Sequence, residues 1–179
     1  MKIFKNIIIA IVAIILLVLI IAALAPSDIY VKRDVTIKKS KSEVFNYVKY
    51  LKNQDEFATW SQIDPNMKKE FTGIDGTVGF VSAWDSNHPD VGKGEQEIIN
   101  IDPGNQIDYK LRFLEPWEST STATMKFSSI DSTTTNVSWD LKGDMPYPMN
   151  LVLLFIDMDE TVGGDLEKGL NNLKGILEN

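Results

Sequence analysis

The residues best suited to chemistry lie in the segment "WDSNHPDVGKG", residues 84–94, which contains the single histidine of the chain. Asp85, His88 and Asp90 could ligate a metal or act as an acid/base group, because imidazole titrates near neutral pH. The competing interpretation is a hairpin connection, in which Asp, Ser, Asn, Pro and Gly supply the turn geometry. We favour the turn, because a catalytic histidine needs an orienting partner and a nucleophile, and neither is evident. We therefore assign no catalytic residue and no metal ligand.

Glycines flank this segment in a way that could suggest a phosphate-binding loop. Gly79, Gly92 and Gly94 match neither the dinucleotide nor the nucleotide fingerprint, and strands rather than a helix are expected to follow them. We expect them to bend the backbone, because curved sheets use glycine kinks and bulges. No cofactor is predicted.

A second acidic cluster, "DMDE", contains Asp157, Asp159 and Glu160. Paired carboxylates can carry out acid/base catalysis, but acids at the start of a helix more often stabilise the positive end of its dipole. We expect the second role here. Arg112, on the polar face of a predicted strand, is expected to be a solvated charge.

Large apolar side chains on inward-facing positions are the more informative set. A sheet that curves around a helix encloses a concave space, and apolar walls with few polar groups form small-molecule pockets. Ordinary core packing is the alternative for any one of these residues. The predicted ligand-binding residues are Trp60, Phe80, Trp84, Tyr109, Phe113, Trp117, Trp139 and Met158.

Composition excludes several classes of function. The 179-residue chain has no cysteine, so thiol catalysis and disulfides are excluded, and one histidine cannot form a two-histidine metal site. From residue 27 onward, 16 basic residues face 25 acidic ones, a balance of −9. Because phosphate binding needs a basic surface, nucleic acid is not an expected partner.

Residues 7–25, "IIIAIVAIILLVLIIAALA", contain no polar side chain. Nineteen residues at about 1.5 Å each span roughly 28 Å, the thickness of the hydrocarbon core of a bilayer. A cleavable signal peptide is the alternative, because "ALA" before Pro26 resembles a cleavage site, but the apolar run is longer than the usual one. We expect an uncleaved single-pass anchor over residues 1–26. Lys2 and Lys5 favour a cytoplasmic amino terminus, which leaves residues 27–179 on the non-cytoplasmic side.

The remaining chain predicts an α+β domain. Residues 29–37 are expected to be extended, and Ser40 with Glu43 forms a capping box that starts a short helix. A second short helix precedes Pro65. Alternating apolar and polar positions then predict antiparallel strands with one solvated face. These strands are expected over residues 67–73, 77–84, 92–101, 106–113, 122–130 and 135–143.

A long amphipathic helix is expected from about Leu151 to the end, with Leu166, Leu170 and Leu173 on its apolar face. Gly163, Gly164 and Gly169 interrupt this helix at a cost of about 1 kcal/mol each relative to alanine. We expect them to permit close approach to the sheet, and the Gly163–Gly164 pair could mark a kink.

The order of these elements, with "ATWSQIDP", "GIDGTVGFVSAW", "VGKGEQEI", "TNVSWDLKG" and "GGDLEKGLNNLKGILE", resembles the START-like (SRPBCC) helix-grip superfamily. The local motifs are most similar to its polyketide cyclase/dehydrase and lipid transport branch. The resemblance covers residues 29–179 and implies a curved antiparallel sheet wrapped around a long C-terminal helix, with a hydrophobic cavity between them. The apolar N-terminal helix is an addition to that domain.

Three functions are compatible with the sequence, because fold does not determine function. The leading hypothesis is a membrane-anchored domain that binds a hydrophobic small molecule, such as a lipid or a polyketide-like compound. The second is a cyclase, dehydratase or hydrolase in the same cavity, with Tyr109, His88 or a cavity acid as the acid/base group. The third is a packed interaction module without a ligand.

Overall fold

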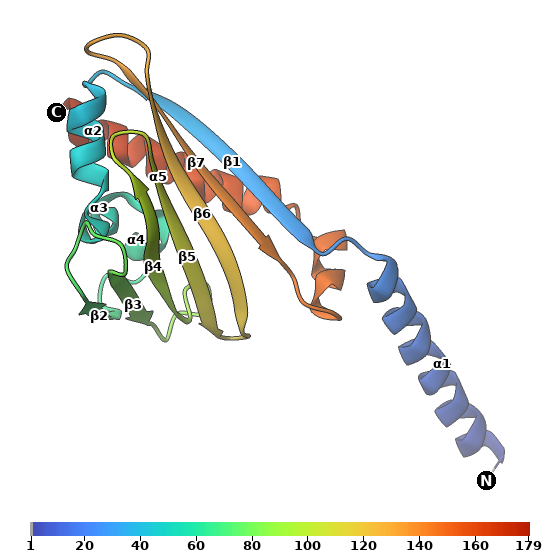
Figure 1. Cartoon of the computed structure of the whole chain (residues 1–179). Coiled ribbons are helices and arrows are strands. Elements are labelled where there is room, and N and C mark those ends of the chain that lie inside the picture. The colour runs from blue at the N-terminus through green and yellow to red at the C-terminus, as the bar shows by residue number, and fades with distance from the viewer. Residues whose placement is uncertain (1) are drawn as a thin grey trace.

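The computed structural model describes residues 2–179, which form an apolar helix, a seven-stranded sheet and a set of shorter helices (Figure 1). The strands are β1 (Asp28–Ile37), β2 (Lys68–Thr72), β3 (Val81–Asp85), β4 (Lys93–Asp102), β5 (Gln106–Glu115), β6 (Ser119–Ser129) and β7 (Thr135–Asp144). The α-helices are α1 (Lys2–Leu24), α2 (Lys41–Val48), α3 (Gln54–Phe57), α4 (Thr59–Ile63) and α5 (Met158–Glu178). Two 3₁₀ helices, η1 (Leu51–Asn53) and η2 (Met149–Leu154), complete the described structure.

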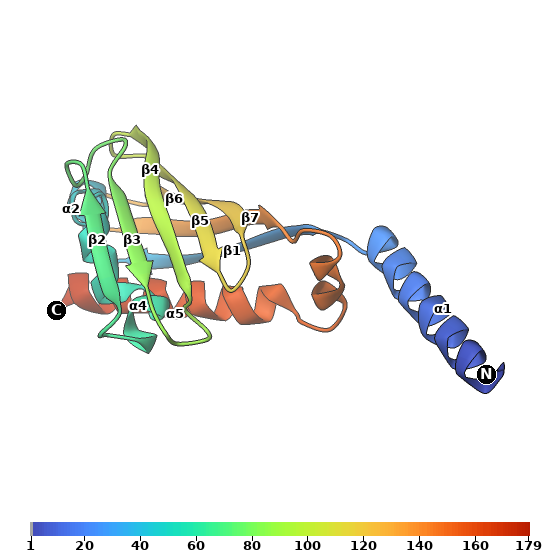
Figure 2. The ribbon, with the colours of Figure 1, turned by 90° about the horizontal axis from the view of Figure 1, so that it is seen from below.

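The sheet is antiparallel throughout, in the order β1-β7-β6-β5-β4-β3-β2. Strand β1 lies at one edge, and the helices α2, η1, α3 and α4 carry the chain to β2 at the other edge. Helix α5 runs across the concave side of the sheet (Figure 2). The predicted α+β helix-grip fold is confirmed.

Alternating burial along the strands builds the core beneath α5. Ile107 and Tyr109 of β5 are buried, as are alternate residues of β6 and β7, while their neighbours in sequence are mostly exposed or half-buried. From the opposite side, α5 contributes Leu166, Leu170 and Leu173, each no more than 1% exposed. The predicted inward faces of these strands and of the helix are therefore confirmed.

Capping at the first short helix follows the predicted pattern. The Ser40 side chain accepts a hydrogen bond from the Glu43 backbone N–H, and the Glu43 carboxylate accepts one from the Ser40 N–H at 3.1 Å. This capping box satisfies two otherwise unpaired donors.

Sheet curvature coincides with glycine and irregular pairing in β4. The register with β5 shifts between Lys93 and Gly94, and again between Ile98 and Asn100. A Cβ at Gly94 would lie 2.6 Å from the Arg112 carbonyl oxygen and 2.6 Å from the Trp84 ring. Only glycine fits this close approach, and its place at a register shift agrees with the predicted role of Gly94 at a bulge.

Two predicted boundaries differ most from the structure. Residues 77–80 form a turn rather than the start of a strand, with Gly79 at φ +88°, so β3 begins only at Val81. The predicted helix from about Leu151 is two elements: η2 ends at Leu154, and α5 starts at Met158 after Asp157, whose carboxylate caps it. The apolar spacing of residues 151–158 matches a helix, but η2 ends at Leu154 with Phe155 as its C-cap, and the extended residue Asp157 is the N-cap that starts α5.

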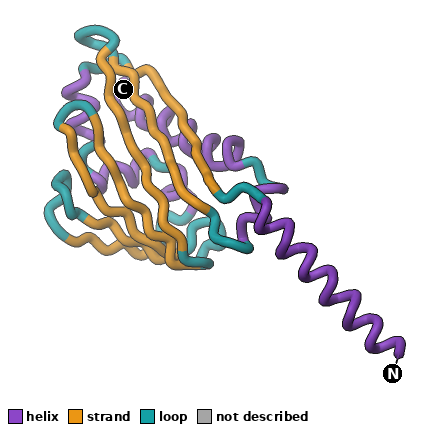
Figure 3. The backbone as a smooth tube through the Cα atoms, turned by 45° about the vertical axis from the view of Figure 1, so that its right-hand side comes forward, coloured by secondary structure: helices purple, strands orange, loops and turns teal. Residues whose placement is uncertain are grey.

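Helix α1 extends away from the domain as an isolated rod (Figure 3). Its apolar side chains from Ile3 to Ile21 are almost all exposed. By length and composition, residues 3–24 could cross a membrane, and almost none of that stretch is buried in the structure. Ala22, near the C-terminal end of α1, is buried where η2 packs against it.

Candidate functional site

Half of the predicted ligand-binding set lies in or against the core. Phe80, Tyr109 and Trp139 are at most 4% exposed. Trp60 packs edge-on against Trp139, with ring centroids 6.2 Å apart, and Phe57 also packs edge-on against Trp139 at 6.0 Å. Phe80, Tyr109 and Trp139 belong to the buried core, and Trp60 packs against it.

The other members of the set are dispersed. Trp84 and Phe113 form an edge-to-face pair with centroids 6.2 Å apart. Trp117 is 49% exposed, between β5 and β6. Met158, the first residue of α5, is half-buried and lines a groove at the other end of the domain. The structure thus brings together Trp60 with Trp139 and Trp84 with Phe113, and it places Met158 in a different setting.

His88 lies in the connection between β3 and β4. The Gly92 and Val91 N–H groups donate to the His88 carbonyl oxygen at 3.0 and 3.1 Å, and the Asp90 N–H donates to its Nδ1 at 3.3 Å. Among the described residues, no group of three His, Asp or Glu side chains is close enough to hold a metal. These contacts are those of a hairpin turn, the interpretation favoured from the sequence.

Tyr109 and His88 do not form a joint acid/base site. The connection that carries His88 follows Asp85, which pairs with Lys93, and Lys93 pairs with Glu115 of β5. Tyr109 lies six residues before Glu115, or roughly 20 Å along the strand at about 3.3 Å per residue. Burial raises the pKa of Tyr109, so its hydroxyl keeps its proton at neutral pH.

A groove of about 500 Å³ opens beside the C-terminal end of α1. That volume lies within the usual range of about 300–1,000 Å³ for small-molecule sites. Its walls come from the start of β1, from η2 and from the start of α5. The lining residues are Pro26, Asp28, Ile29, Tyr30, Leu153, Leu154, Phe155, Ile156, Asp157 and Met158. Ile29 and Met158 also pack against the core, so the groove floor is the end of the hydrophobic core.

One wall of the groove is joined to α1 by Asn150. The Asn150 Nδ2 donates to the Ala22 carbonyl oxygen at 2.7 Å and to the Ala25 carbonyl oxygen at 3.2 Å. In a regular helix, Ala22 would accept from the N–H four residues later, but that residue is Pro26, which has none. Asn150 supplies the missing donor, and it is itself only 3% exposed.

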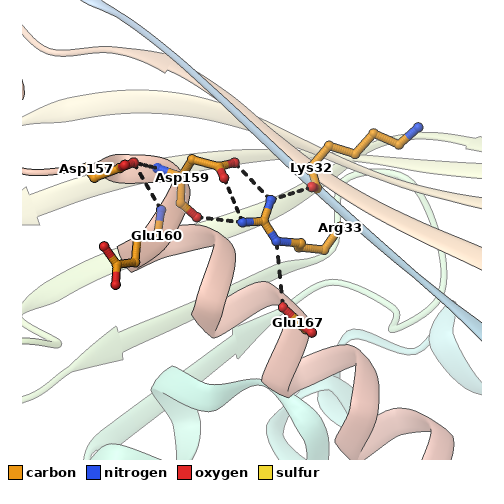
Figure 4. Close-up of polar contacts among 6 residues, drawn as sticks. All are labelled: Lys32, Arg33, Asp157, Asp159, Glu160 and Glu167. Atoms are coloured by element: carbon orange, nitrogen blue, oxygen red, sulfur yellow. Dashed lines mark hydrogen bonds and ion pairs between the residues drawn. The ribbon is translucent and has the colours of Figure 1, made fainter.

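The other wall is held by Arg33 (Figure 4). Its guanidinium donates to both carboxylate oxygens of Asp159 at 2.9 Å and to the Asp159 backbone oxygen at 2.7 Å. Asp157 accepts hydrogen bonds from the Asp159 and Glu160 N–H groups at 2.9 and 3.2 Å, which caps α5 as predicted for this acidic cluster. Hydrogen bonding to Arg33 lowers the pKa of Asp159. Strand β1 and the start of α5 are therefore tied together beside the groove.

The glycines of α5 differ in how closely other residues approach them. A Cβ at Gly163 would clash with the Arg33 guanidinium, and one at Gly169 would lie 3.1 Å from the Trp139 ring. At Gly164 no atom lies within 4 Å of an added Cβ. The predicted close approach is confirmed at Gly163 and Gly169, and it is wrong at Gly164.

The sequence analysis did not predict three parts of the candidate site: Asn150, Arg33 and the groove-lining segment of residues 153–156. Arg112, expected to be a solvated charge, keeps a side chain that is 31% exposed and also pairs with Glu95 at 2.7 Å and Glu97 at 2.5 Å, contacts that were not expected. A signal for Asn150 is present, because Pro26 at the end of an apolar helix leaves a carbonyl without its donor. Nothing local indicates that Arg33 and Asp159 meet, since 126 positions separate them.

Comparison with known proteins identifies a fold and no family. No family model matches the chain, and no curated protein matches it. Truncated norcoclaurine synthase from Thalictrum flavum matches with a TM-score of 0.61 and 9% identity, over 85% of this chain and 94% of that one. A structural-genomics protein from Chromobacterium violaceum matches with a TM-score of 0.59 and 12% identity, over 84% and 97%.

These similarities define the class of protein, a helix-grip domain with an added apolar helix. A further structure of norcoclaurine synthase, 9% identical with a TM-score of 0.57 over 88% of this chain and 90% of that one, is a complex with dopamine and hydroxybenzaldehyde. At such identities the likeness concerns the fold alone. The function of this chain therefore has to be argued from its own groove and helix.

Proposed function

We propose that this protein is a single-pass membrane protein, anchored by residues 1–26, whose domain of residues 27–179 binds a lipid-like molecule in the groove beside α1. The observation that carries the proposal is the position of the groove, since a space of about 500 Å³ adjoins the end of a helix long enough to span a bilayer. Within the helix-grip class, this corresponds to a lipid-binding or lipid-transport role.

The anchor is argued from the exposure of α1. A core helix would bury its apolar face, whereas α1 exposes almost all of its apolar side chains and extends away from the domain. Exposing that much apolar surface to water is strongly unfavourable, and a bilayer removes it. Asn150 also favours an uncleaved helix, because cleavage after Ala25 would remove the Ala22 and Ala25 carbonyl groups that it binds.

The ligand class follows from the lining. Seven of the ten lining residues are aliphatic, proline, methionine or phenylalanine side chains, and each methylene that they remove from water contributes about 0.8 kcal/mol. The charged members, Asp28 and Asp157, are both acidic. Like charges repel, so we expect a neutral or zwitterionic head group rather than an anionic one.

We propose that the predicted aromatic residues form an inner extension of the groove. Met158 and Ile29 join the groove to the core, so an apolar tail that enters at Met158 would reach the core that contains Trp60 and Trp139. Accommodating a tail there requires these aromatic side chains to move apart. We propose the groove as the binding site and the aromatic set as its inner extension.

The test is ligand capture by the full chain. Wild-type protein in mild detergent is mixed with fluorescent phosphatidylcholine and with a fluorescent fatty acid. Leu153→Trp is compared with Leu114→Trp, a matched substitution at an exposed position near the end of β5. We expect saturable phosphatidylcholine binding by the wild type. The affinity should fall about tenfold in Leu153→Trp, which corresponds to a loss of roughly 1.4 kcal/mol of binding free energy, and should be retained in Leu114→Trp. Equal binding by both variants would exclude the groove, and tighter binding of the fatty acid would exclude the head-group assignment.

A further inference from the structure

An apolar patch lies beside the groove and supplies part of its lining. It consists of Tyr147, Leu154, Phe155 and Ile156, which are 56%, 47%, 87% and 44% exposed. These residues flank or belong to η2 and are close together in sequence. Phe155 is the most exposed large apolar side chain of the described residues. Clustered apolar exposure of this kind marks an interaction surface rather than ordinary surface variation.

Contacts with α1 fix how deep the patch must lie. Asn150 of η2 binds the carbonyl oxygen of Ala22, and the Tyr147 hydroxyl reaches the carbonyl oxygen of Leu19 at 3.4 Å. At about 1.5 Å per residue, Ala22 and Leu19 lie about 4.5 and 9 Å before Ala25 along the helix axis. Since the apolar run of residues 7–25 ends at Ala25, both contacts are made alongside the apolar part of α1.

We propose that η2 and the patch lie in the interface of the leaflet that surrounds the C-terminal end of α1, so that the groove opens directly onto lipid. This inference rests on the proposed membrane anchor. If α1 spans the bilayer, η2 cannot stand clear of the head groups while its segment contacts Ala22 and Leu19. The partner is the lipid bilayer itself.

The residue types in the patch suit this position. Tyrosine is enriched at membrane interfaces, because its ring is apolar and its hydroxyl remains hydrated. Phe155, Leu154 and Ile156 can each bury their side chains among acyl chains, as in interfacial amphipathic segments. The charged lining residues, Asp28 and Asp157, occupy the groove beside the patch and can remain at head-group level.

The docked η2 segment also restricts how the domain moves. Residues 25–27 would be a flexible tether if nothing else held the domain. Instead, the Asn150 hydrogen bonds at 2.7 and 3.2 Å tie η2 to the end of α1, and the Met145 N–H donates to the Ser27 carbonyl oxygen at 2.7 Å. The groove therefore keeps a constant orientation toward the membrane.

The chain has no cysteine, so single cysteines can report depth without further changes. Full-length Phe155→Cys, Leu16→Cys and Ile130→Cys variants are placed in phosphatidylcholine vesicles and reacted with a membrane-impermeant maleimide, and rates are compared rather than extents. Ile130 is 60% exposed in the β6–β7 turn, at the end of the sheet away from α1 (Figure 1). The Leu16→Cys variant reports whether α1 is in the bilayer.

We expect the Leu16→Cys thiol not to react and the Phe155→Cys thiol to react at least about tenfold more slowly than that of Ile130→Cys. The reason is that an apolar environment raises a thiol pKa and lowers the reactive thiolate fraction.

Each other outcome overturns a distinct part of the proposal. If Leu16→Cys is protected and Phe155→Cys reacts as fast as Ile130→Cys, the docked patch is excluded while the anchor stands. If Leu16→Cys reacts freely, the anchor of the proposed function fails. If Phe155→Cys is protected but is cross-linked between two copies by a short bis-maleimide, a second copy covers the patch and the membrane docking is excluded.

Discussion

The Asn150 side chain donates a 2.7 Å hydrogen bond to the backbone oxygen of Ala22, the helical carbonyl that Pro26 leaves without a donor. This contact replaces a missing intrahelical bond with one from the domain. It holds η2, which supplies one wall of the groove, against the C-terminal end of the apolar helix. Helix α1 is therefore held to the domain by hydrogen bonds as well as by the polypeptide chain.

Replacement of Asn150 by alanine should release η2 from α1. A buried carbonyl left without a donor costs about 1–3 kcal/mol, so local opening of residues 147–156 should become roughly tenfold more frequent or more. Hydrogen exchange of the full chain in vesicles measures this directly. Asn46→Ala is the control, because the Asn46 amide makes only an exposed 3.3 Å contact with Ser42. Equal exchange in both variants would show that Asn150 does not hold η2 against α1.

Adjacent glycines in α5 should respond differently to alanine. Gly164→Ala places a methyl group in open space and should raise the free energy of unfolding by up to about 1 kcal/mol through helix propensity. Gly163→Ala displaces the Arg33 guanidinium, so its gain should be smaller or reversed. Urea unfolding compares the two. In an Asp159→Asn background, where Arg33 keeps only its 3.9 Å contact with Glu167 as an ion pair, the difference between them should shrink. An unchanged difference would mean that Arg33 is not the cause.

The pair of Arg33 and Asp159 should make stability depend on acid pH. Arg33 lowers the pKa of Asp159 in the folded state, so the unfolded chain binds more protons as the pH falls. The stabilisation is fully present above the ordinary aspartate pKa and is lost as the pH falls through the lowered pKa of Asp159. Urea unfolding at several acid pH values should show a shallower pH dependence for Asp159→Asn than for wild type. Glu160→Gln is the matched control, since the Glu160 carboxylate points away from Arg33 (Figure 4), and an equal change there would contradict the assignment.

Substitution of His88 should leave binding intact. The His88 side chain lies at the surface of a hairpin connection, 43% exposed, and surface substitutions usually change stability by less than about 0.5 kcal/mol. We expect His88→Ala to bind phosphatidylcholine as wild type does and to melt at the same temperature. Loss of binding with an unchanged melting temperature would give this residue a role at a site and revive the enzymatic interpretation.

Periodicity accounts for most of what the sequence can predict. Alternation along β5, β6 and β7 predicts their buried faces correctly, because one side of each strand faces the hydrophobic core. The spacing of Leu166, Leu170 and Leu173 predicts the helix for the same reason. The predicted start of α5 is wrong, since apolar spacing over residues 151–158 does not reveal the extended conformation of Asp157.

The groove could not be predicted because it depends on contacts between distant segments. Ile29 and Met158 come from opposite ends of the domain sequence, and Arg33 meets Asp159 across 126 positions. Inward-facing aromatic residues such as Tyr109 were predicted as pocket walls, but alternation reports which side a residue faces and not whether space remains beside it. Of the eight predicted residues, Met158 is the one that lines the groove.

Photo-crosslinking from lipid to protein tests the central claim most directly. Full-length protein in vesicles that contain phosphatidylcholine with a photoactivatable acyl chain is irradiated, and the labelled peptides are identified by mass spectrometry. Our account predicts labels on residues 26–30 and 153–158 in addition to α1, and a marked loss of these labels in Leu153→Trp. Labels confined to α1, or labels on residues 26–30 and 153–158 that persist unchanged in Leu153→Trp, would contradict a lipid site in the groove.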